Sequence, residues 1–375
     1  MKANRYMAAI VGAALAISFV LPGAVSAQDD DKWRNAFSAF QRGDYAEAET
    51  QFREVCTYYE DQGQPWGWCH MMLGTTLAAS GVVSKRQEAL AQLELAKELV
   101  ANDGERYMTH NGIAQIHLVS RNWARAIDSA NDARAFANAE QQGVLAKTKG
   151  QAYYNLQDFA SAARELAIAV TTRGNEANLF AQLGHSYFEN NEKEKALPQL
   201  VKAAQLDRNN RIGLFFAARI HLDDGNFEQA IALAERAIQA HPQDTSIRDI
   251  LGTAYLGEDR FQEAEQQFLV VLQDRPNKQL TIYNLAQAYT AMKDWPRAIE
   301  QYQKAQNLFA AGSPMQARLL YDLGVAFETI SRNEDALRAY KDSAAISENV
   351  DKTDAIERVE ERIRRAKGKG KGGSG

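Results

Sequence analysis

The stretch "LGTAYLGEDRFQEAEQQFLVVLQDRP", residues 251–276, alternates small and large apolar residues at intervals that match no catalytic motif. Apolar residues recur at helical spacing on both sides of "GEDR", which predicts two helices joined by a turn. Gly252 and Ala264 are small, so we expect the two helices to approach closely at these positions. The aromatic residues Tyr255, Phe261 and Phe268 would fill the space around that contact. We therefore interpret the stretch as a packed core and not as a reactive site.

The same pattern returns along most of the chain, for example in "KGQAYYNLQDFASAARELAIAV" and "LAQAYTAMKDWPRAIEQYQKAQ". Nine repeats can be marked by the small residue of the first helix, which we call the anchor. The anchors are Ala36, Gly74, Ala114, Gly150, Gly184, Ala218, Gly252, Ala286 and Gly324. Their spacings are 38, 40, 36, 34, 34, 34, 34 and 38 residues, so a 34-residue period holds across the middle of the chain.

A 34-residue period with Gly or Ala, an aromatic residue and then Ala resembles the tetratricopeptide repeat family. The resemblance implies an all-α, right-handed α-solenoid of about nine repeats over residues 28–349. We expect a charged capping helix over residues 350–366 and a disordered Gly/Lys tail over 367–375. The first repeat is atypical, because Lys32 and Asn35 fall where core residues are expected, and we interpret its first helix as a rotated cap.

The amino terminus has the features of a secretory signal peptide. Lys2 and Arg5 precede an apolar run of about 15 residues, and small residues follow up to Ala27. The run is shorter than the roughly 20 residues that a membrane-spanning helix needs. We expect cleavage of residues 1–27, no stable membrane insertion afterwards, and export to the periplasm or the medium. An uncleaved membrane anchor is the alternative, and Gln28 in place of Cys disfavours a lipid anchor.

The composition excludes several classes of function. The chain carries 43 basic and 48 acidic residues, a formal charge of −5, so we expect no nucleic-acid binding. The sequence contains no zinc-binding, phosphate-binding or nucleophile-elbow motif, which predicts no metal, no cofactor and no enzymatic activity. Histidines at core positions of first helices are expected to be packed and hydrogen-bonded, and these are His70, His110, His117 and His221.

Cys56 and Cys69 are the two cysteines of the chain. Cys56 ends the second helix of repeat 1 and Cys69 begins the first helix of repeat 2, so the segment between them can bring them together. In an oxidising compartment a disulfide is expected. Two reduced thiols, or a redox or metal site that includes His70, are the alternatives.

A second stripe on the first helices is not required by the predicted core. In the tetratricopeptide family this face lines a concave groove, and its aromatic and amide side chains would suit an extended peptide. The predicted groove residues are Lys147, Gln151, Tyr154 and Asn155 in repeat 4, Asn178, His185 and Phe188 in repeat 5, Phe215, Arg219 and Leu222 in repeat 6, and Tyr283, Asn284 and Gln287 in repeat 8. The alternative is a face that packs internally or is solvated.

These observations lead to one functional hypothesis and one alternative. The hypothesis is a non-catalytic adaptor of the cell envelope or periplasm that holds a protein or peptide in its groove. The alternative is a scaffold that self-associates without a dedicated ligand. The sequence leaves the oligomeric state and the identity of the partner open.

Overall fold

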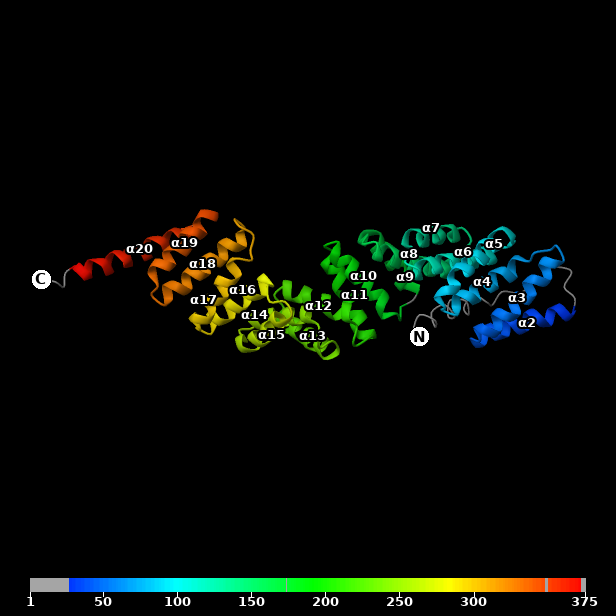
Figure 1. The fold of residues 1–375 in the computed structure, drawn as a ribbon, viewed down its shortest axis with the longest axis horizontal. Helices are drawn as coiled ribbons and strands as arrows, with labels where there is room; N and C mark the ends of the chain where they lie inside the picture. Colours follow the sequence, from blue (N-terminus) through cyan, green and yellow to red (C-terminus); the bar gives the residue numbers. More distant parts are fainter. Residues whose placement is uncertain (1–26, 173, 348–349, 372–375) are drawn as a thin grey trace. The chain divides into compact units, whose positions relative to one another are not determined.

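The computed structural model describes residues 27–172, 174–347 and 350–371, and within them the chain is helical without strands (Figure 1). It divides into two compact units, one ending at Leu206 and one beginning at Asp207. The predicted all-α fold is confirmed. None of the described helices combines the length and the apolar character needed to cross a bilayer.

The first unit contains α2 to α11. Their bounds are α2 Ala27–Arg42, α3 Tyr45–Asp61, α4 Gly67–Ala79, the 3₁₀ turn η1 Val83–Lys85, α5 Arg86–Leu99, α6 Asp103–Val119, α7 Trp123–Arg134, α8 Ala139–Asn155, α9 Phe159–Thr172, α10 Ala177–Glu189 and α11 Lys193–Leu206.

The second unit contains α12 to α20. Their bounds are α12 Arg211–Asp223, α13 Phe227–Ala240, α14 Thr245–Gly257, α15 Phe261–Asp274, α16 Gln279–Ala291, α17 Trp295–Gln306, α18 Pro314–Thr329, α19 Asn333–Ile346 and α20 Val350–Lys371.

Helices pack in consecutive pairs, each pair forming one repeat. The even-numbered helices α2 to α18 are the first helices of the nine repeats, and α3 to α19 are the second helices. Within each unit a first helix contacts its own second helix most extensively, and the second helix then contacts the next first helix. Consecutive first helices also touch, as α8 does α10. This nearest-neighbour stacking is the arrangement expected of a solenoid.

The anchors lie where the two helices of a repeat meet. A Cβ atom added to Gly252 would lie 2.7 Å from Cε1 of Phe268, and one added to Gly324 would lie 2.6 Å from Cδ1 of Tyr340. Phe268 and Tyr340 are fully buried. Glycine is therefore required at these anchors because an aromatic ring of the second helix occupies the space that a side chain would need.

The turns between paired helices share one backbone feature. Seven residues after each anchor the backbone adopts a positive φ, between 56° and 81°. Glycine occupies this position in three repeats, and the others carry Arg121, Gln157, Asn191, Asp259, Lys293 and Ser331. In eight of the repeats the following amide donates back into the first helix, as Asp158 N–H does to Tyr153 O at 3.0 Å, and the turn closes as a Schellman-type cap. In repeat 2 the Val82 amide donates instead to Oγ of Ser80 at 3.3 Å.

Both ends of the array are closed by helices with one packed face. In α2, Trp33, Ala36 and Phe40 are buried while Lys32 and Asn35 are exposed, which matches the rotation that the sequence predicts. In α20, Val359 is buried against the ninth repeat, and Lys352 is buried with its ammonium donating to Ser343 O and Ser347 O at the end of α19. A cation at a helix carboxyl end can donate to the last carbonyls and interacts favourably with the helix dipole.

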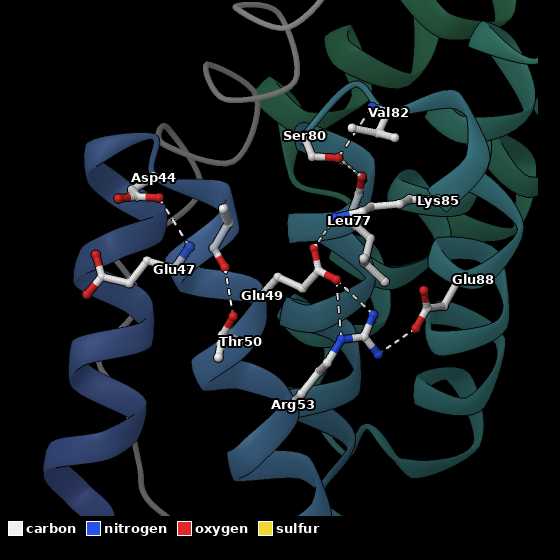
Figure 2. A network of polar contacts seen from close by, with 11 residues as sticks. Asp44, Glu47, Glu49, Thr50, Arg53, Leu77, Ser80, Val82, Lys85 and Glu88 are labelled. Carbon is white, nitrogen blue, oxygen red and sulfur yellow. Dashed lines mark hydrogen bonds and ion pairs between the residues drawn. The ribbon is translucent and has the colours of Figure 1, made fainter.

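The segment between α4 and α5 of repeat 2 is attached to α3 by charged side chains (Figure 2). Glu49 on α3 accepts from Lys85 Nζ at 2.6 Å and from Arg53 at 2.9 Å, and Arg53 also pairs with Glu88 of α5 at 2.5 Å. Burial opposes ionisation of Glu49, but its two basic partners outweigh that effect and lower its pKa. This segment therefore forms η1 directly before α5, and the ion pair of Lys85 with Glu49 holds it against α3.

Part of the predicted domain boundaries lies outside the described residues. This holds for residues 1–26 of the predicted signal peptide and for residues 372–375 of the predicted tail. The capping helix α20 runs to Lys371, which is beyond its predicted end at residue 366.

Candidate partner-binding surface

The predicted groove residues all lie on first helices, but in two separate units. Repeats 4 and 5 place theirs on α8 and α10 of the first unit, and these helices contact each other. Repeats 6 and 8 place theirs on α12 and α16 of the second unit. The predicted residues that lie on two contacting helices are therefore those of α8 and α10, and among them the structure brings Tyr154 and His185 into direct contact. Leaving out the buried Lys147, we call this set the α8–α10 surface: Gln151, Tyr154, Asn155, Asn178, His185 and Phe188.

A hydrogen-bonded chain crosses the α8–α10 surface. The Tyr154 hydroxyl lies 2.6 Å from Nδ1 of His185, and Nε2 of the same ring lies 3.1 Å from Oε1 of Glu189. With Nε2–H donating to the carboxylate, Nδ1 accepts from the tyrosine. The rings of Tyr154 and His185 also meet edge to face at 5.4 Å. This chain fixes the orientation of two aromatic side chains.

The electrostatics of this chain favour its neutral form. Burial lowers the pKa of His185, although the Glu189 carboxylate opposes that shift. Burial and the charge of Glu189 raise the pKa of the Tyr154 hydroxyl. A tyrosine whose ionisation is suppressed can donate a hydrogen bond but is a poor nucleophile. The arrangement therefore keeps the Tyr154 hydroxyl as a neutral hydrogen-bond donor.

The rest of the α8–α10 surface is accessible to solvent. Asn155 and Asn178 are exposed, and Gln151 and Phe188 are half-buried. The Asn155 side-chain N–H donates to the backbone carbonyl of Gln151 on its own helix at 2.7 Å. The surface thus offers amide groups beside aromatic rings.

Three predicted groove residues are buried. Lys147 pairs with Glu176 at 2.5 Å, Tyr283 donates to Asp322 at 2.6 Å, and Asn284 donates to Thr253 at 3.3 Å. Burial raises the pKa of both Tyr283 and Asp322. Gln287, which is half-buried, donates to the Tyr283 hydroxyl at 3.0 Å. In the structure these side chains connect neighbouring repeats.

In repeat 6 the predicted residues of α12 remain at the surface. Phe215 is half-buried, stacks edge to face on Phe216 at 4.9 Å and lies under the Arg211 guanidinium at 5.6 Å. Arg219 is exposed and pairs with Asp223 at 2.9 Å. Leu222 is half-buried. An aromatic ring beside cations can contact an apolar or an acidic side chain of a partner.

Sequence reasoning missed Glu189 and Phe159. Glu189 lies four residues after His185, one helical turn along the same face. This spacing could have predicted that the two side chains pair. Phe159 begins α9 and packs against both Tyr154, at 5.9 Å, and His185, at 5.5 Å. The period of the first helix cannot reveal a residue that a second helix contributes.

The cysteine prediction is confirmed: Cys56 and Cys69 form a disulfide, with their Cα atoms 5.6 Å apart. The two sulfurs and a ring nitrogen of His70 lie within 4.8 Å of one another. Because both sulfurs are bonded to each other, this cluster does not offer thiolate ligands. His70 is packed in the core, and its Nδ1 lies 2.8 Å from Oε1 of Gln92.

We expect the first unit to lose stability in mild acid. Burial lowers the pKa of His110, His117 and His185 below 6.5 in the folded chain. Below pH 6.5 the unfolded chain then binds more protons than the folded chain. The stabilisation that comes from keeping these histidines neutral is therefore complete above pH 6.5 and is lost as the pH falls through their folded pKa values. Calorimetry from pH 7.5 to about 5.5 should show a falling melting temperature. Glu49 has a pKa below 4.5, so it stays ionised over this pH range and does not contribute to the change.

A double variant provides the control for this pH dependence. His110→Gln with His117→Gln removes two of the three groups, and it should flatten the curve between pH 7.5 and about 5.5. An equally steep fall in the variant would contradict the assignment.

Comparison with protein families identifies the repeat. Three tetratricopeptide repeat models match residues 177–210, 215–278 and 278–349. Among solved structures, the C-terminal part of a TPR repeat-containing protein from Cytophaga hutchinsonii is 20% identical, with a TM-score of 0.50 over 65% of this chain and 98% of that one.

Two further structures match over shorter parts. MamA from Desulfovibrio magneticus is 18% identical, with a TM-score of 0.41 over 44% of this chain and 94% of that one. YrrB, described as a TPR protein with an unusual peptide-binding site, is 18% identical, with a TM-score of 0.46 over 52% of this chain and 98% of that one. The family matches and the fold agree with the nine helix pairs, and the chain belongs to the tetratricopeptide repeat family.

Proposed function

We propose that the chain is a non-catalytic adaptor that binds a protein or peptide on the exposed faces of its first helices. Tetratricopeptide repeat proteins bind proteins or peptides, which supports this class of function. The observation that carries the proposal is the α8–α10 surface, where aromatic and amide side chains lie half-buried or exposed on adjacent helices.

The chemistry of the α8–α10 surface fits an extended segment. Phe188 would cover an apolar side chain, while Asn155 and Asn178 would pair with main-chain amides that an extended peptide leaves open. The hydrogen-bonded chain through His185 holds the aromatic part of the surface in place, which reduces the ordering cost of binding.

We expect Phe188→Ala together with Phe215→Ala to weaken partner binding at least about tenfold, because aromatic anchors often contribute about 2 kcal/mol or more and 1.4 kcal/mol corresponds to a factor of ten. Each single variant reports on its own unit. Isothermal titration with a partner captured from the native host measures the affinity. Melting temperatures should stay nearly unchanged because both rings are only half-buried.

Leu95→Ala is the matched control, since Leu95 is an exposed apolar residue on the second helix α5 and lies off the proposed face. Unchanged affinity in the double phenylalanine variant would place the binding surface elsewhere. Light scattering on the wild-type chain addresses the alternative of a self-associating scaffold, which a monomer at micromolar concentration would disfavour.

We also propose that the protein is exported. The Cys56–Cys69 disulfide supports this, because disulfides persist in oxidising compartments. Intact-mass measurement of protein isolated from the native host should find Gln28 as the first residue. Retention of residues 1–27 would refute cleavage at that point.

A further inference from the structure

A small cavity opens between the second helices α7 and α9 of the first unit, with α8 as its floor. It has a volume of about 70 Å³ and is lined by Arg134, Gln142, Leu145, Ala146, Lys149, Glu165 and Ile168. The predicted groove residues of α8 play no part in this lining. The cavity is therefore distinct from the α8–α10 surface.

Lys149 is the unusual residue of this cavity. It directly precedes the anchor Gly150, and the residues that precede the anchors of six other repeats are buried and aliphatic. These are Leu73, Ile113, Leu183, Leu251, Leu285 and Leu323. Lys149 is buried as well, with a side-chain exposure of 8%. Repeat 4 thus places an ammonium group where those six repeats use a buried aliphatic side chain.

Packing alone does not account for this lysine. Its Nζ lies 3.0 Å from Oε1 of Glu165, whose side-chain exposure is 14%. A buried ion pair is often no more stabilising than apolar residues of similar volume, because both charges lose their hydration. An ammonium group has three N–H donors, and the contact with Glu165 uses one of them.

The remaining lining shows which ligand would fit. The Arg134 guanidinium forms no hydrogen bond or ion pair among the described residues, so the cavity holds two cations against the single carboxylate of Glu165. Ile168 is 47% exposed and, with Leu145 and Ala146, supplies an apolar wall. The space corresponds to roughly two water molecules at about 30 Å³ each.

We propose that this cavity binds a carboxylate carried on a short aliphatic chain, such as the acidic side chain of a partner protein or a free short-chain acid. Lys149 and Arg134 pair with the carboxylate, and the wall formed by Ile168 covers the aliphatic carbons. The excess of one positive charge matches a monoanion better than a phosphate dianion. This site lies beyond the proposed first-helix surface and does not depend on it.

The test uses the methyl signal of Ile168 in the full-length protein labelled at isoleucine methyl groups, assigned through Ile168→Val. Sodium propionate should shift this signal saturably, while propionamide, which lacks the charge, should not. An amidated, N-acetylated peptide containing one glutamate tests the side-chain source against the free acid. Sodium phosphate at equal ionic strength should produce at most a weak shift.

Two variants separate binding from folding. Arg134→Gln changes an exposed side chain and should weaken propionate binding several-fold. Lys149→Leu with Glu165→Gln restores the aliphatic residue of the other repeats, so it should melt no lower than the wild type and bind propionate at least tenfold more weakly. An Ile168 shift that does not saturate, that phosphate reproduces more strongly, or that both variants retain would overturn the proposal.

Discussion

Replacing Phe268 by alanine is expected to lower the free energy of unfolding of the second unit by about 3–5 kcal/mol, the usual effect of removing a buried aromatic ring from a core. Phe268 is fully buried, and its ring fills the space left by the absent side chain of Gly252. The glycine cannot compensate for the loss, so a cavity would remain between α14 and α15. Urea denaturation of the full chain, followed by circular dichroism, measures the shift.

The neighbouring Leu269 supplies the control for this experiment. It lies on the same helix and is 43% exposed, so Leu269→Ala removes an apolar side chain of similar size from the surface. We expect a loss within about 1 kcal/mol, as for most substitutions outside the core. Equal losses for Phe268→Ala and Leu269→Ala would mean that α15 is rotated relative to the structure described above.

The repeated core was predictable from sequence because its signal is local and recurs nine times. Each anchor must be small for the same steric reason, so one interpretation applied to Gly252 extends to Gly324. The positive-φ residue of each turn was not visible in the same way. Six of the nine are not glycine, and residues such as Arg121 or Lys293 carry no sequence signal for a left-handed backbone.

The candidate surface was only partly predictable, because helical periodicity gives the direction of a side chain and not its depth. Tyr283 lies on the predicted face, yet Asp322 of the next first helix and Phe309 of the preceding loop cover it. Phe309 directly precedes the segment "AAGSP", which lengthens repeat 8. A residue 39 positions away cannot be inferred from the pattern of one repeat.

The same limit applies to charge pairs between helices. Lys147 was predicted at the groove, but Glu176, at the residue before α10, draws its ammonium into a buried pair. Asn178, two residues further along, stays exposed. Which polar residue becomes buried depends on the partner that the neighbouring repeat presents.

Removing the disulfide is expected to destabilise the first unit by about 3 kcal/mol. The bond joins residues separated by 13 positions, and a closed loop of this size restricts the unfolded chain by roughly that amount. Cys56 and Cys69 are both buried beside Trp68, so alanine is the better replacement because it leaves no unpaired polar atom in the core. Thermal melts of Cys56→Ala/Cys69→Ala against the oxidised wild type measure the effect.

Reduction of the wild type is an independent way to remove the disulfide. It should lower the stability of the first unit by the same amount as the double alanine variant if the bond acts by restricting the unfolded chain. A reducing agent should lower the melting temperature of the wild type and leave the double alanine variant unchanged. The second unit contains no cysteine, so its transition should stay in place under both treatments. Labelling of two thiols in untreated protein isolated from the native host would show that the bond is not formed there. A loss in both units would instead mean that the repeats unfold as one cooperative array, since nearest-neighbour coupling carries local destabilisation along a solenoid.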